Sequence, residues 1–378
     1  MRGKPDYQTQ IYYPIDIESW IPADHPLREV KRRADEALHA MRGDFEKAYS
    51  KLGRPSIPPE MLLKALLLQA LYTVRSERQL VEQIQMNLLY KWFIDLSLDA
   101  ETWNATTFTK NRKRFEEHGL LRTFFDHVVE QAYVEEWASE ERFTVDGTLI
   151  ESYASLKSLR PKGRGEERVS GGADDDDRGN RTVNFRGEKR GSATHESVVD
   201  PEARLYKKSH GVAAKLSHGA HVLMENRNGL VIDVSVTEAN GFAEREAALE
   251  MLTRARERHE LEPLTLGADK GYAAGAFLVA LEEEQGIVPL IPMPAIPIKG
   301  SSKGARARRR ARRRRTSKQF KLAQKVRKRV EEIIGWDKVV GGMRRSRHVG
   351  RWKITQQVLL VNSAYNLIRM ARLGAQAV

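Results

Sequence analysis

The sequence predicts an α/β protein whose first part is entirely helical. From Pro59 the run PEMLLKALLLQALYTV is rich in strong helix formers and almost continuously apolar, which indicates a helix buried on most sides. Near residue 140 the pattern changes to the period of a strand, and strand-like and helical segments then alternate to about residue 291. Such alternation is typical of a parallel sheet covered by helices.

The composition indicates a partner with negative charge. The chain has 378 residues, enough for two or three domains, and its 64 Lys and Arg outnumber 51 Asp and Glu to leave a formal charge of +13. Such a chain attracts polyanions through their phosphates, so nucleic acid is the natural partner. A membrane surface would suit the charge equally well, but no apolar run approaches the ~20 residues that span a bilayer. The N-terminus also lacks the apolar stretch of a signal peptide, and we expect a soluble intracellular protein.

The chain has no cysteine. This excludes a disulfide framework, a thiol nucleophile and any zinc finger that uses cysteine. A metal ion would have to bind to oxygen or imidazole ligands, and oxygen ligands suit hard cations such as Mg²⁺ and Mn²⁺.

A basic segment of the helical region is a candidate DNA contact. A second helix is expected to begin at Ser76 after a short break, which makes a helical pair. The segment FTKNRKRF then gathers basic residues beside two phenylalanines, as in the DNA-facing helix of a helix-turn-helix unit. Its basic residues are Lys110, Arg112, Lys113 and Arg114. A solvated helix face is the alternative interpretation.

The predicted sheet begins with a strand from Phe143 to Thr148 that carries Asp146 on its polar face. After it we expect, in order, strands at 218–225 and 230–237 joined by an Asn-Arg-Asn-Gly turn, a helix at 244–260, a strand in LTLGAD, a helix at 277–284 and a strand at 287–291. The strand in LTLGAD places Asp269 at its polar end.

Two segments are too polar or too basic to hold a core. Residues from about 152 to 210 are predicted to form a mobile insertion, whose acidic run at 174–177 is expected to be solvated rather than to bind metal. Residues from about 292 to 316 combine breakers with an arginine run, and we expect a basic loop that contacts DNA. The candidates within it are Arg312, Arg313, Arg314 and Arg315.

A late helix carries the third candidate carboxylate. Val326, Val330 and Ile333 recur at helical spacing, and Arg327 and Glu331 lie four residues apart on the neighbouring stripe. A last amphipathic helix is expected from about residue 354 to 373.

Asp146, Asp269 and Glu331 are the candidate catalytic and metal-binding residues. Breaking and joining phosphodiesters needs an activated oxygen, a stabilised leaving oxygen and relief of phosphate charge, which two metal ions about 3.5–4 Å apart supply. Carboxylates from separate elements are needed to hold them. An aspartate before glycine is also common in turns, and Glu331 beside Arg327 is also typical of a surface ion pair, so spacing alone leaves both interpretations open.

Several motifs together resemble the DDE transposases of bacterial insertion sequences. Val145-Asp146-Gly147-Thr148 looks like the first aspartate motif of that family, and Asp269-Lys270-Gly271-Tyr272 looks like the second. The helical stretch from about Arg54 to Phe115 is similar to the helical domain that precedes the catalytic core. The resemblance covers the chain from about Arg54 to the end.

The resemblance is to the branch with a Tyr-Arg-Glu-Lys signature. Arg327, Glu331 and Lys338 keep the spacing of that signature, whereas its Tyr position holds Gln324. This departure bears on a DNA contact and not on the metal ligands. In the branch, Arg327 and Lys338 would contact phosphates, which suits the forked guanidinium and the ammonium point charge.

The resemblance implies an RNase H-like catalytic core with a mixed sheet. Asp146 would lie on its first strand, Asp269 after the fourth and Glu331 on a following helix. It also implies binding of terminal inverted repeats, DNA cleavage with two Mg²⁺ ions, for which Mn²⁺ would substitute, and strand transfer into target DNA. We accordingly expect a homodimer on double-stranded DNA, in the bacterial cytoplasm and associated with the nucleoid.

These observations divide the chain into a helical DNA-binding domain at 1–138 and an RNase H-like catalytic domain at 139–378. Two other functions remain open at this stage. One is a catalytically inactive DNA-binding protein or repressor derived from a transposase, and the other is a metal-dependent nuclease that cuts without joining.

Overall fold

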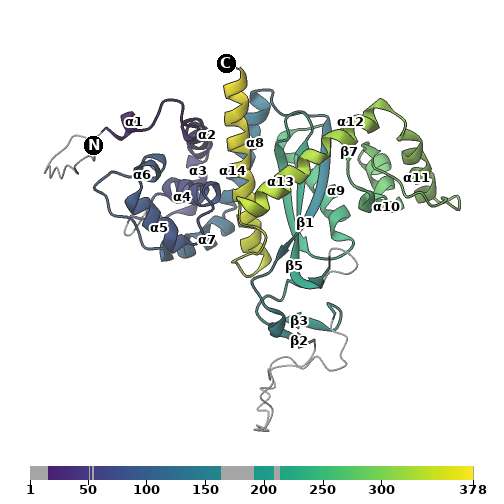
Figure 1. Ribbon diagram of the computed structural model, residues 1–378, viewed down its shortest axis with the longest axis horizontal. Helices are drawn as coiled ribbons and strands as arrows, with labels where there is room; N and C mark the ends of the chain where they lie inside the picture. Colours follow the sequence, from purple (N-terminus) through teal and green to yellow (C-terminus); the bar gives the residue numbers. More distant parts are fainter. Residues whose placement is uncertain (1–15, 51, 53–54, 163–190, 208–212, 378) are drawn as a thin grey trace, which may run out of the picture.

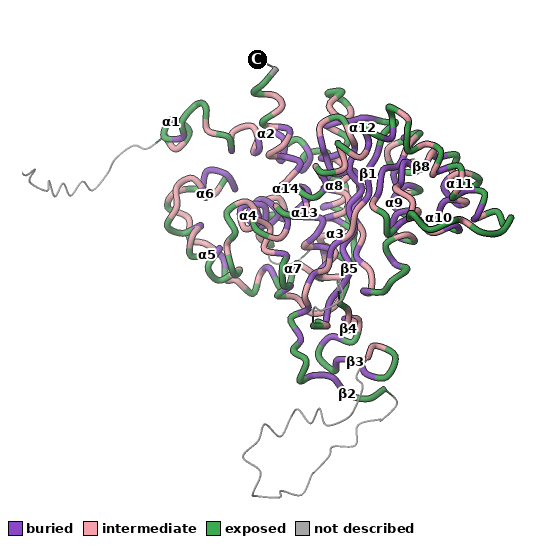
Figure 2. Tube along the Cα trace, turned by 45° about the vertical axis from the view of Figure 1, so that its right-hand side comes forward, coloured by how far each residue is buried: buried purple, intermediate pink, exposed green. Residues whose placement is uncertain are grey.

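A computed structural model describes residues 16–50, 52, 55–162, 191–207 and 213–377. Figure 1 shows a helical N-terminal region on one side of the long helix α14 (Arg351–Ala377) and a sheet with its own helices on the other. Buried residues run through both regions (Figure 2), and most of the buried apolar side chains belong to a single cluster. Within the described residues, no helix is long and apolar enough to cross a membrane.

The helical prediction for the N-terminal region is confirmed. Its helices are α1 (Ile17–Trp20), α2 (Leu27–Ala40), α3 (Arg42–Ala48), α4 (Pro59–Leu71), α5 (Glu77–Met86), α6 (Leu88–Phe93), α7 (Thr106–Glu117) and α8 (Leu120–Val134). Helix α4 starts with a proline in its first turn, where the missing N–H is not needed. Helix α5 starts after Ser76, whose hydroxyl accepts a hydrogen bond from the Gln79 amide at 3.1 Å.

The main sheet contains β1 (Arg142–Glu151), β4 (Arg204–Tyr206), β5 (Lys215–Glu225), β6 (Val231–Glu238), β7 (Thr265–Gly267) and β8 (Val288–Leu290). Strand β1 is antiparallel to β5 and parallel to β7, which is parallel to β8. Strand β5 also pairs antiparallel with β6. The sheet is therefore mixed, not all parallel as the alternation alone predicted, because the Asn-Arg-Asn-Gly turn closes β5 and β6 into a hairpin.

This topology is RNase H-like, as the resemblance implied. Strands β1, β5 and β6 form an antiparallel meander, and β7 and β8 are added in parallel on the other side of β1. Strand β1 therefore lies in the middle of the sheet, and its side chains have neighbours on both sides.

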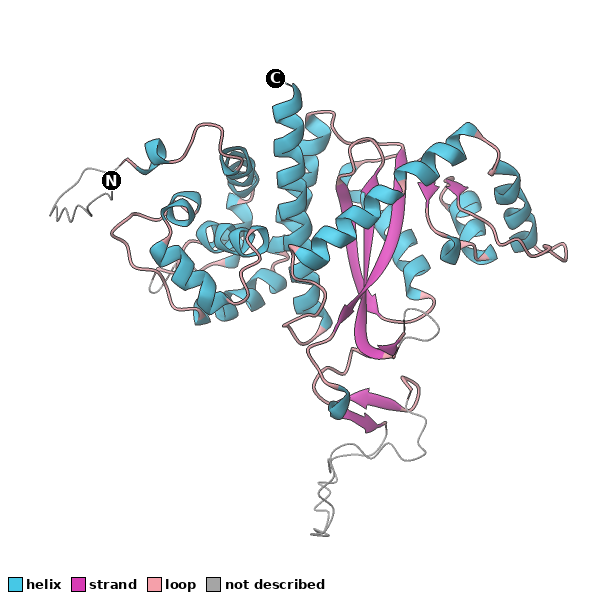
Figure 3. Ribbon diagram, viewed as in Figure 1, coloured by secondary structure: helices cyan, strands magenta, loops and turns pink. Residues whose placement is uncertain are grey.

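Helices cover both faces of the sheet. Helix α9 (Ala243–His259) packs against β5 and β6, and α13 (Lys328–Val339) packs against β1. Figure 3 shows α13 crossing in front of the strands and α9 behind them. Helix α14 packs against α8, α4 and β6, so the last helix joins the N-terminal region to the sheet.

The described parts of the predicted insertion have regular structure, which corrects the expectation of an unstructured segment. A short 3₁₀ helix (Leu156–Ser158) leads to β2 (Leu159–Pro161), which pairs with β3 (His195–Ser197). Asp200 is fully buried and accepts from the Ser152 hydroxyl at 2.6 Å, and its carboxylate also lies 2.9 Å from the His218 ring. These polar contacts and a small apolar cluster of Ala154, Leu159, Ala203 and Leu216 hold this segment. The acidic run at 174–177 lies outside the described residues.

The arginine run forms helix α11 (Lys303–Arg314) instead of the predicted basic loop, and α12 (Lys318–Val326) follows it. The buried face of α11 consists of alanines, namely Ala305, Ala307 and Ala311. This face packs against α10 (Gly275–Val279), where a Cβ added to Gly275 would lie 2.9 Å from the Gly304 Cα. Two glycines thus permit a close helix contact, and the arginines occupy the rest of the surface.

A buried carboxylate organises the end of the β5–β6 hairpin. Glu225 is fully buried and accepts backbone hydrogen bonds from Ser139 at 3.0 Å, Arg227 at 2.6 Å, Asn228 at 2.8 Å and Leu230 at 2.9 Å. The carboxylate therefore satisfies the turn and also fastens it to the segment between α8 and β1. An ionised acceptor makes stronger hydrogen bonds to N–H groups than a neutral one does.

Replacing Glu225 by Gln should destabilise the fold by about 3 kcal/mol, because the amide keeps one accepting oxygen and turns its NH₂ group toward backbone donors. The free energy of unfolding in urea measures this change. Glu262→Gln, at an exposed position, is the matched control. Equal unfolding free energies for the two variants would contradict the assigned role of Glu225.

Candidate active site

Asp146 projects from the middle of β1 and is 19% exposed. One carboxylate oxygen accepts a hydrogen bond from the Gly147 amide at 2.8 Å. Burial raises the pKa of Asp146, and the negative charges of Asp269 and Glu331 raise it further, whereas the Gly147 amide and the Arg327 charge lower it. The other two predicted carboxylates are thus close enough to act on Asp146 electrostatically.

Asp269 follows β7, which runs parallel to β1 with Gly267 opposite Thr144. Continuing this register by two residues sets Asp269 beside Asp146. The Asp269 carboxylate accepts from the Gly271 amide at 2.7 Å and begins the 3₁₀ turn η2 (Lys270–Tyr272). This local hydrogen bond fixes the turn that follows β7 and the position of the carboxylate in it.

Glu331 lies in the first turn of α13, and its side chain is 58% exposed. Arg327 precedes it by one helical turn. One guanidinium nitrogen of Arg327 is 3.4 Å from a Glu331 oxygen and 3.9 Å from an Asp146 oxygen. The packing of α13 on β1 therefore brings Glu331 to the side of the sheet where Asp146 lies, with Arg327 between the two carboxylates.

The donor types at this site suit a hard divalent cation, because all three groups are carboxylates. Among the described residues, however, no group of three or more His, Asp or Glu side chains has the spacing that holds a metal ion. The positive charge of Arg327 partly offsets the negative charges of Asp146 and Glu331 in this arrangement. Holding a metal here requires Arg327 to give up one of these contacts, and the exposed Glu331 side chain has the freedom to turn toward Asp146.

The other two signature positions have structural neighbours. The Gln324 side-chain amide donates to the Leu290 carbonyl at 2.8 Å and so fastens α12 to the end of β8. Lys338 lies in the last turn of α13, about two turns beyond Glu331, and is partly buried. The structure therefore does not bring Lys338 to the three carboxylates as directly as it brings Arg327.

The basic candidate residues of α7 differ in their exposure and in their contacts with the rest of the chain. Lys110 is exposed. Arg112 forms an ion pair with Glu77, and the Arg114 guanidinium lies over the Tyr49 ring at 4.3 Å and donates to Asn111 at 3.1 Å. Within the described part of the chain, no ion pair or ring contact involves Lys110, whereas Arg112 and Arg114 help to hold α7 in place.

The basic candidates of α11 divide in the same way. Arg312 donates to the Pro294 and Ile296 carbonyls, each at 2.6 Å, and Arg314 forms an ion pair with Glu282. Arg313 and Arg315 are exposed. Of these four arginines, Arg312 and Arg314 therefore contact the rest of the fold, and Arg313 and Arg315 face solvent.

A further carboxylate, Glu244, approaches β1 from the other face of the sheet and is not among the residues that the sequence singled out. Glu244 lies in the first turn of α9, and a Cβ built on Gly147 would be 3.3 Å from its carboxylate. Because side chains alternate along a strand, Glu244 approaches the face of β1 opposite to Asp146. Burial raises the pKa of Tyr272 well above its usual value, and the charges of Glu244, Asp146 and Asp269 raise it further. Glu244 is one of many charges in its helix, and no sequence pattern marks it.

Comparisons with known proteins match two families along the chain. Residues 15–114 match the family described as Transposase domain (DUF772). Residues 189–367 match the family described as Transposase DDE domain, a stretch that includes Asp269 and Glu331. No curated protein matches the chain.

Among solved structures, the chain is similar to a chain described as the Mos1 transposase paired-end complex with left transposon end. The identity is 11% and the TM-score is 0.21, with 77% of this chain and 85% of that chain covered.

Proposed function

We propose that this chain is a DDE transposase, which cuts DNA at the terminal inverted repeats of an insertion sequence and joins the freed 3′-hydroxyl to target DNA; the two transposase domain matches support this. The observation that carries the proposal is the approach of three acidic side chains from separate elements. Asp146 comes from β1, Asp269 from the end of β7 and Glu331 from α13. The charges of Asp269 and Glu331 both raise the pKa of Asp146, which supports a shared site.

In this proposal Asp146, Asp269 and Glu331 hold two Mg²⁺ ions. Such ions supply the activation of the attacking oxygen and the charge relief at the leaving oxygen. Arg327 stays beside Glu331 and binds a phosphate oxygen of the cleaved strand through its fork. Asp146 is held in place by the Gly147 amide, so it needs little reorganisation when DNA binds.

The proposed DNA surface uses the basic side chains that face solvent. Lys110 on α7, and Arg313 and Arg315 at the end of α11, are exposed, and the formal charge of the chain is +13. Contacts of this kind bind phosphates without reading sequence and weaken as salt is raised. Because two element ends must be cut and joined together, we propose that two copies act on one DNA complex.

A cleavage and joining assay tests the proposal. DNA carrying the two ends of the native element is incubated with the protein in Mg²⁺ or in EDTA. We expect cut ends and joined products only in Mg²⁺. The Glu331→Ala variant should lower the rate on the order of a thousandfold, because it removes one of three acidic ligands.

Glu332→Ala is the matched control, because Glu332 is the exposed neighbour of Glu331 on the same helix. It should retain cleavage within about threefold of the unchanged protein, a difference of less than one kcal/mol. Cut ends without joined products would indicate a nuclease. Binding of the ends without any cleavage that depends on metal would indicate an inactive DNA-binding protein.

A further inference from the structure

A pocket lies where the helical N-terminal region meets the end of α13 and the start of α14. Its volume is about 350 Å³, and its walls come from the turn between α4 and α5, from α7, from the loop after α13 and from α14. The Thr73 hydroxyl donates to the Val340 carbonyl at 3.0 Å, and the Gln356 side chain donates to the Arg112 carbonyl at 3.1 Å. Side chains from both parts of the chain therefore form this pocket together.

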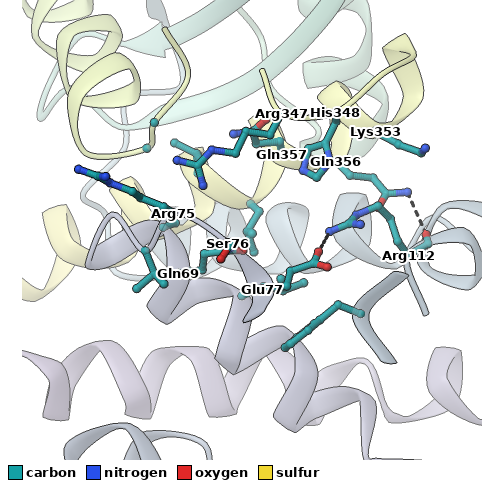
Figure 4. Close-up of a pocket in the computed structure, with 18 of the residues that line it drawn as sticks. Gln69, Arg75, Ser76, Glu77, Arg112, Arg347, His348, Lys353, Gln356 and Gln357 are labelled. Atoms are coloured by element: carbon teal, nitrogen blue, oxygen red, sulfur yellow. Dashed lines mark hydrogen bonds and ion pairs between the residues drawn. The ribbon is translucent and has the colours of Figure 1, made fainter. Parts of the chain in front are cut away.

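The pocket is strongly basic. Its lining contains Arg75, Arg112, Arg347, His348 and Lys353. The only carboxylate among the lining residues is Glu77, which forms an ion pair with Arg112. Figure 4 shows this pair, with the side chains of Arg75 and Arg347 on the other side of the pocket.

Arg75 and Arg347 both line the pocket, and both residues are exposed. No ion pair joins Arg75 or Arg347 to a carboxylate within the described residues. Burial and the nearby charge of Arg75 lower the pKa of Arg347. An anion bound between these two guanidinium groups would relieve their repulsion.

The positive charges that line the pocket also affect His348. Burial, together with the charges of Arg112, Lys353 and Arg347, lowers the pKa of His348 to about 4. His348 is therefore neutral at pH 7 and adds no further repulsion. Its ring is available as a hydrogen-bond donor to an anion that approaches the arginines.

The residues that line the pocket suit a phosphate group that is part of a larger molecule. Helix α5 has ten residues and begins at this pocket, so its first N–H groups add to the attraction for an anion. Leu66, Phe108 and Leu360 line the pocket as well and give it an apolar part. Forked guanidinium groups suit the tetrahedral oxygens of phosphate, and the apolar part suits the sugar or base that carries it.

We propose that this pocket binds a phosphate group of a nucleotide unit and thereby couples the helical region to the helix that carries Glu331. The unit belongs either to a DNA strand or to a free nucleotide, and both present the same phosphate chemistry. The pocket adjoins the C-terminal end of α13, whose first turn holds Glu331. A phosphate bound at the C-terminal end of α13 would therefore influence the position of its N-terminal end, where Glu331 lies.

The first arm of the test uses free phosphate compounds. The melting temperature of the full chain is measured with inorganic phosphate or dAMP and with sodium chloride or acetate at equal ionic strength. We expect phosphate and dAMP to raise it by on the order of 2 °C more than the control salts do. The variant Arg75→Gln/Arg347→Gln should lose this shift.

The matched control is Arg78→Gln/Arg344→Gln, which removes two exposed arginines from adjoining positions outside the pocket. It should keep the shift. Without added phosphate, the pocket variant should melt at the same temperature as the unchanged protein or higher, because it removes a repulsion. Lys353→Gln, on another wall of the pocket, provides a second variant with the same expected loss of the shift.

The second arm uses DNA and rests on the proposed function. The Kd for a duplex is measured as a function of salt for the unchanged protein, the pocket variant and the control variant. A DNA phosphate in the pocket should make the pocket variant bind about tenfold more weakly than the control variant, with a salt slope smaller by about one.

The outcomes separate the two sources and the two proposals. A phosphate-dependent melting shift that only the pocket variant loses, with unchanged DNA affinity, supports a free nucleotide, and a selective loss of DNA affinity supports a DNA strand. If the pocket variant and the control variant show the same melting shift and the same DNA affinity, the proposed phosphate site is contradicted. Failure of the unchanged protein to bind DNA would count against the proposed function alone, since the first arm needs no DNA.

Discussion

Replacing Asp146 by Asn is expected to lower DNA cleavage at least a thousandfold while DNA binding stays within about twofold. Asparagine has the shape of aspartate and can still accept from the Gly147 amide through its oxygen. It lacks the negative charge that a divalent cation requires. Removing that charge also takes away one repulsion between the protein and phosphate, so binding should not weaken.

The measurements are the single-turnover cleavage rate in saturating Mg²⁺ and the Kd for a duplex carrying the element end. Asp99→Asn, at an exposed loop position, is the control and should match the unchanged protein in both. Mg²⁺ should raise the melting temperature of the control more than that of Asp146→Asn, which reports on the metal without any reaction. Retention of a tenth of the cleavage rate by Asp146→Asn would remove Asp146 from the site.

Replacing Asp337 by Asn is expected to stabilise the folded protein at neutral pH. Asp337 is fully buried on α13, where its only side-chain hydrogen bond within the described residues comes from Asn362 at 3.4 Å. Burial raises the pKa of Asp337 to about 7. Its other carboxylate oxygen is buried with no hydrogen-bond partner. An ionised carboxylate is poorly accommodated in such surroundings.

The stability depends on pH because Asp337 has a different pKa in the folded and in the unfolded chain. Below pH 4 the carboxyl group is neutral in both the folded and the unfolded chain, so it has no effect. Between pH 4 and 7 the unfolded chain loses the proton and the folded chain keeps it, so stability falls as the pH rises. A shift from 3.8 to about 7 corresponds to a loss of about 4 kcal/mol, which is complete above pH 7.

Asparagine at this position does not titrate and avoids this loss. The unfolding free energy of Asp337→Asn should therefore exceed that of the unchanged protein by several kcal/mol at pH 8 and by little at pH 4.5. Urea unfolding at these two pH values measures the difference. Asp24→Asn, at an exposed position, is the control. A difference that is the same at both pH values would contradict the buried titration of Asp337.

Local patterns were sufficient for the elements that hold the carboxylates. The alternation around Asp146, the turn residues after Glu225 and the apolar run from Pro59 each correspond to an element in the structure. These features depend on contacts between residues that are near in sequence, such as strand alternation and turn hydrogen bonds. The direction of the strands was harder, because a hairpin reverses the chain and makes the sheet mixed.

The arginine run could not be interpreted correctly from its charge. It was expected to be a loop, but Ala305, Ala307 and Ala311 give it an apolar face that fits α10. That fit needs Gly275 and Gly304 to meet, and these glycines are far enough apart in sequence that no local pattern pairs them. Charge composition describes the solvent side of such a helix and not its buried side.

The sequence by itself determined the element order, the positions of Asp146, Asp269 and Glu331 on those elements, and the basic character that suits DNA, because these follow from local spacing and from counted charge. Only the tertiary structure decided which basic side chains are committed to the fold, how Arg327 stands between two carboxylates, and that Arg75 and Arg347 share a pocket. These depend on the packing of α13 and α14 against distant parts of the chain. Such long-range contacts set burial and charge neighbours, and a pattern of nearby residues does not contain them.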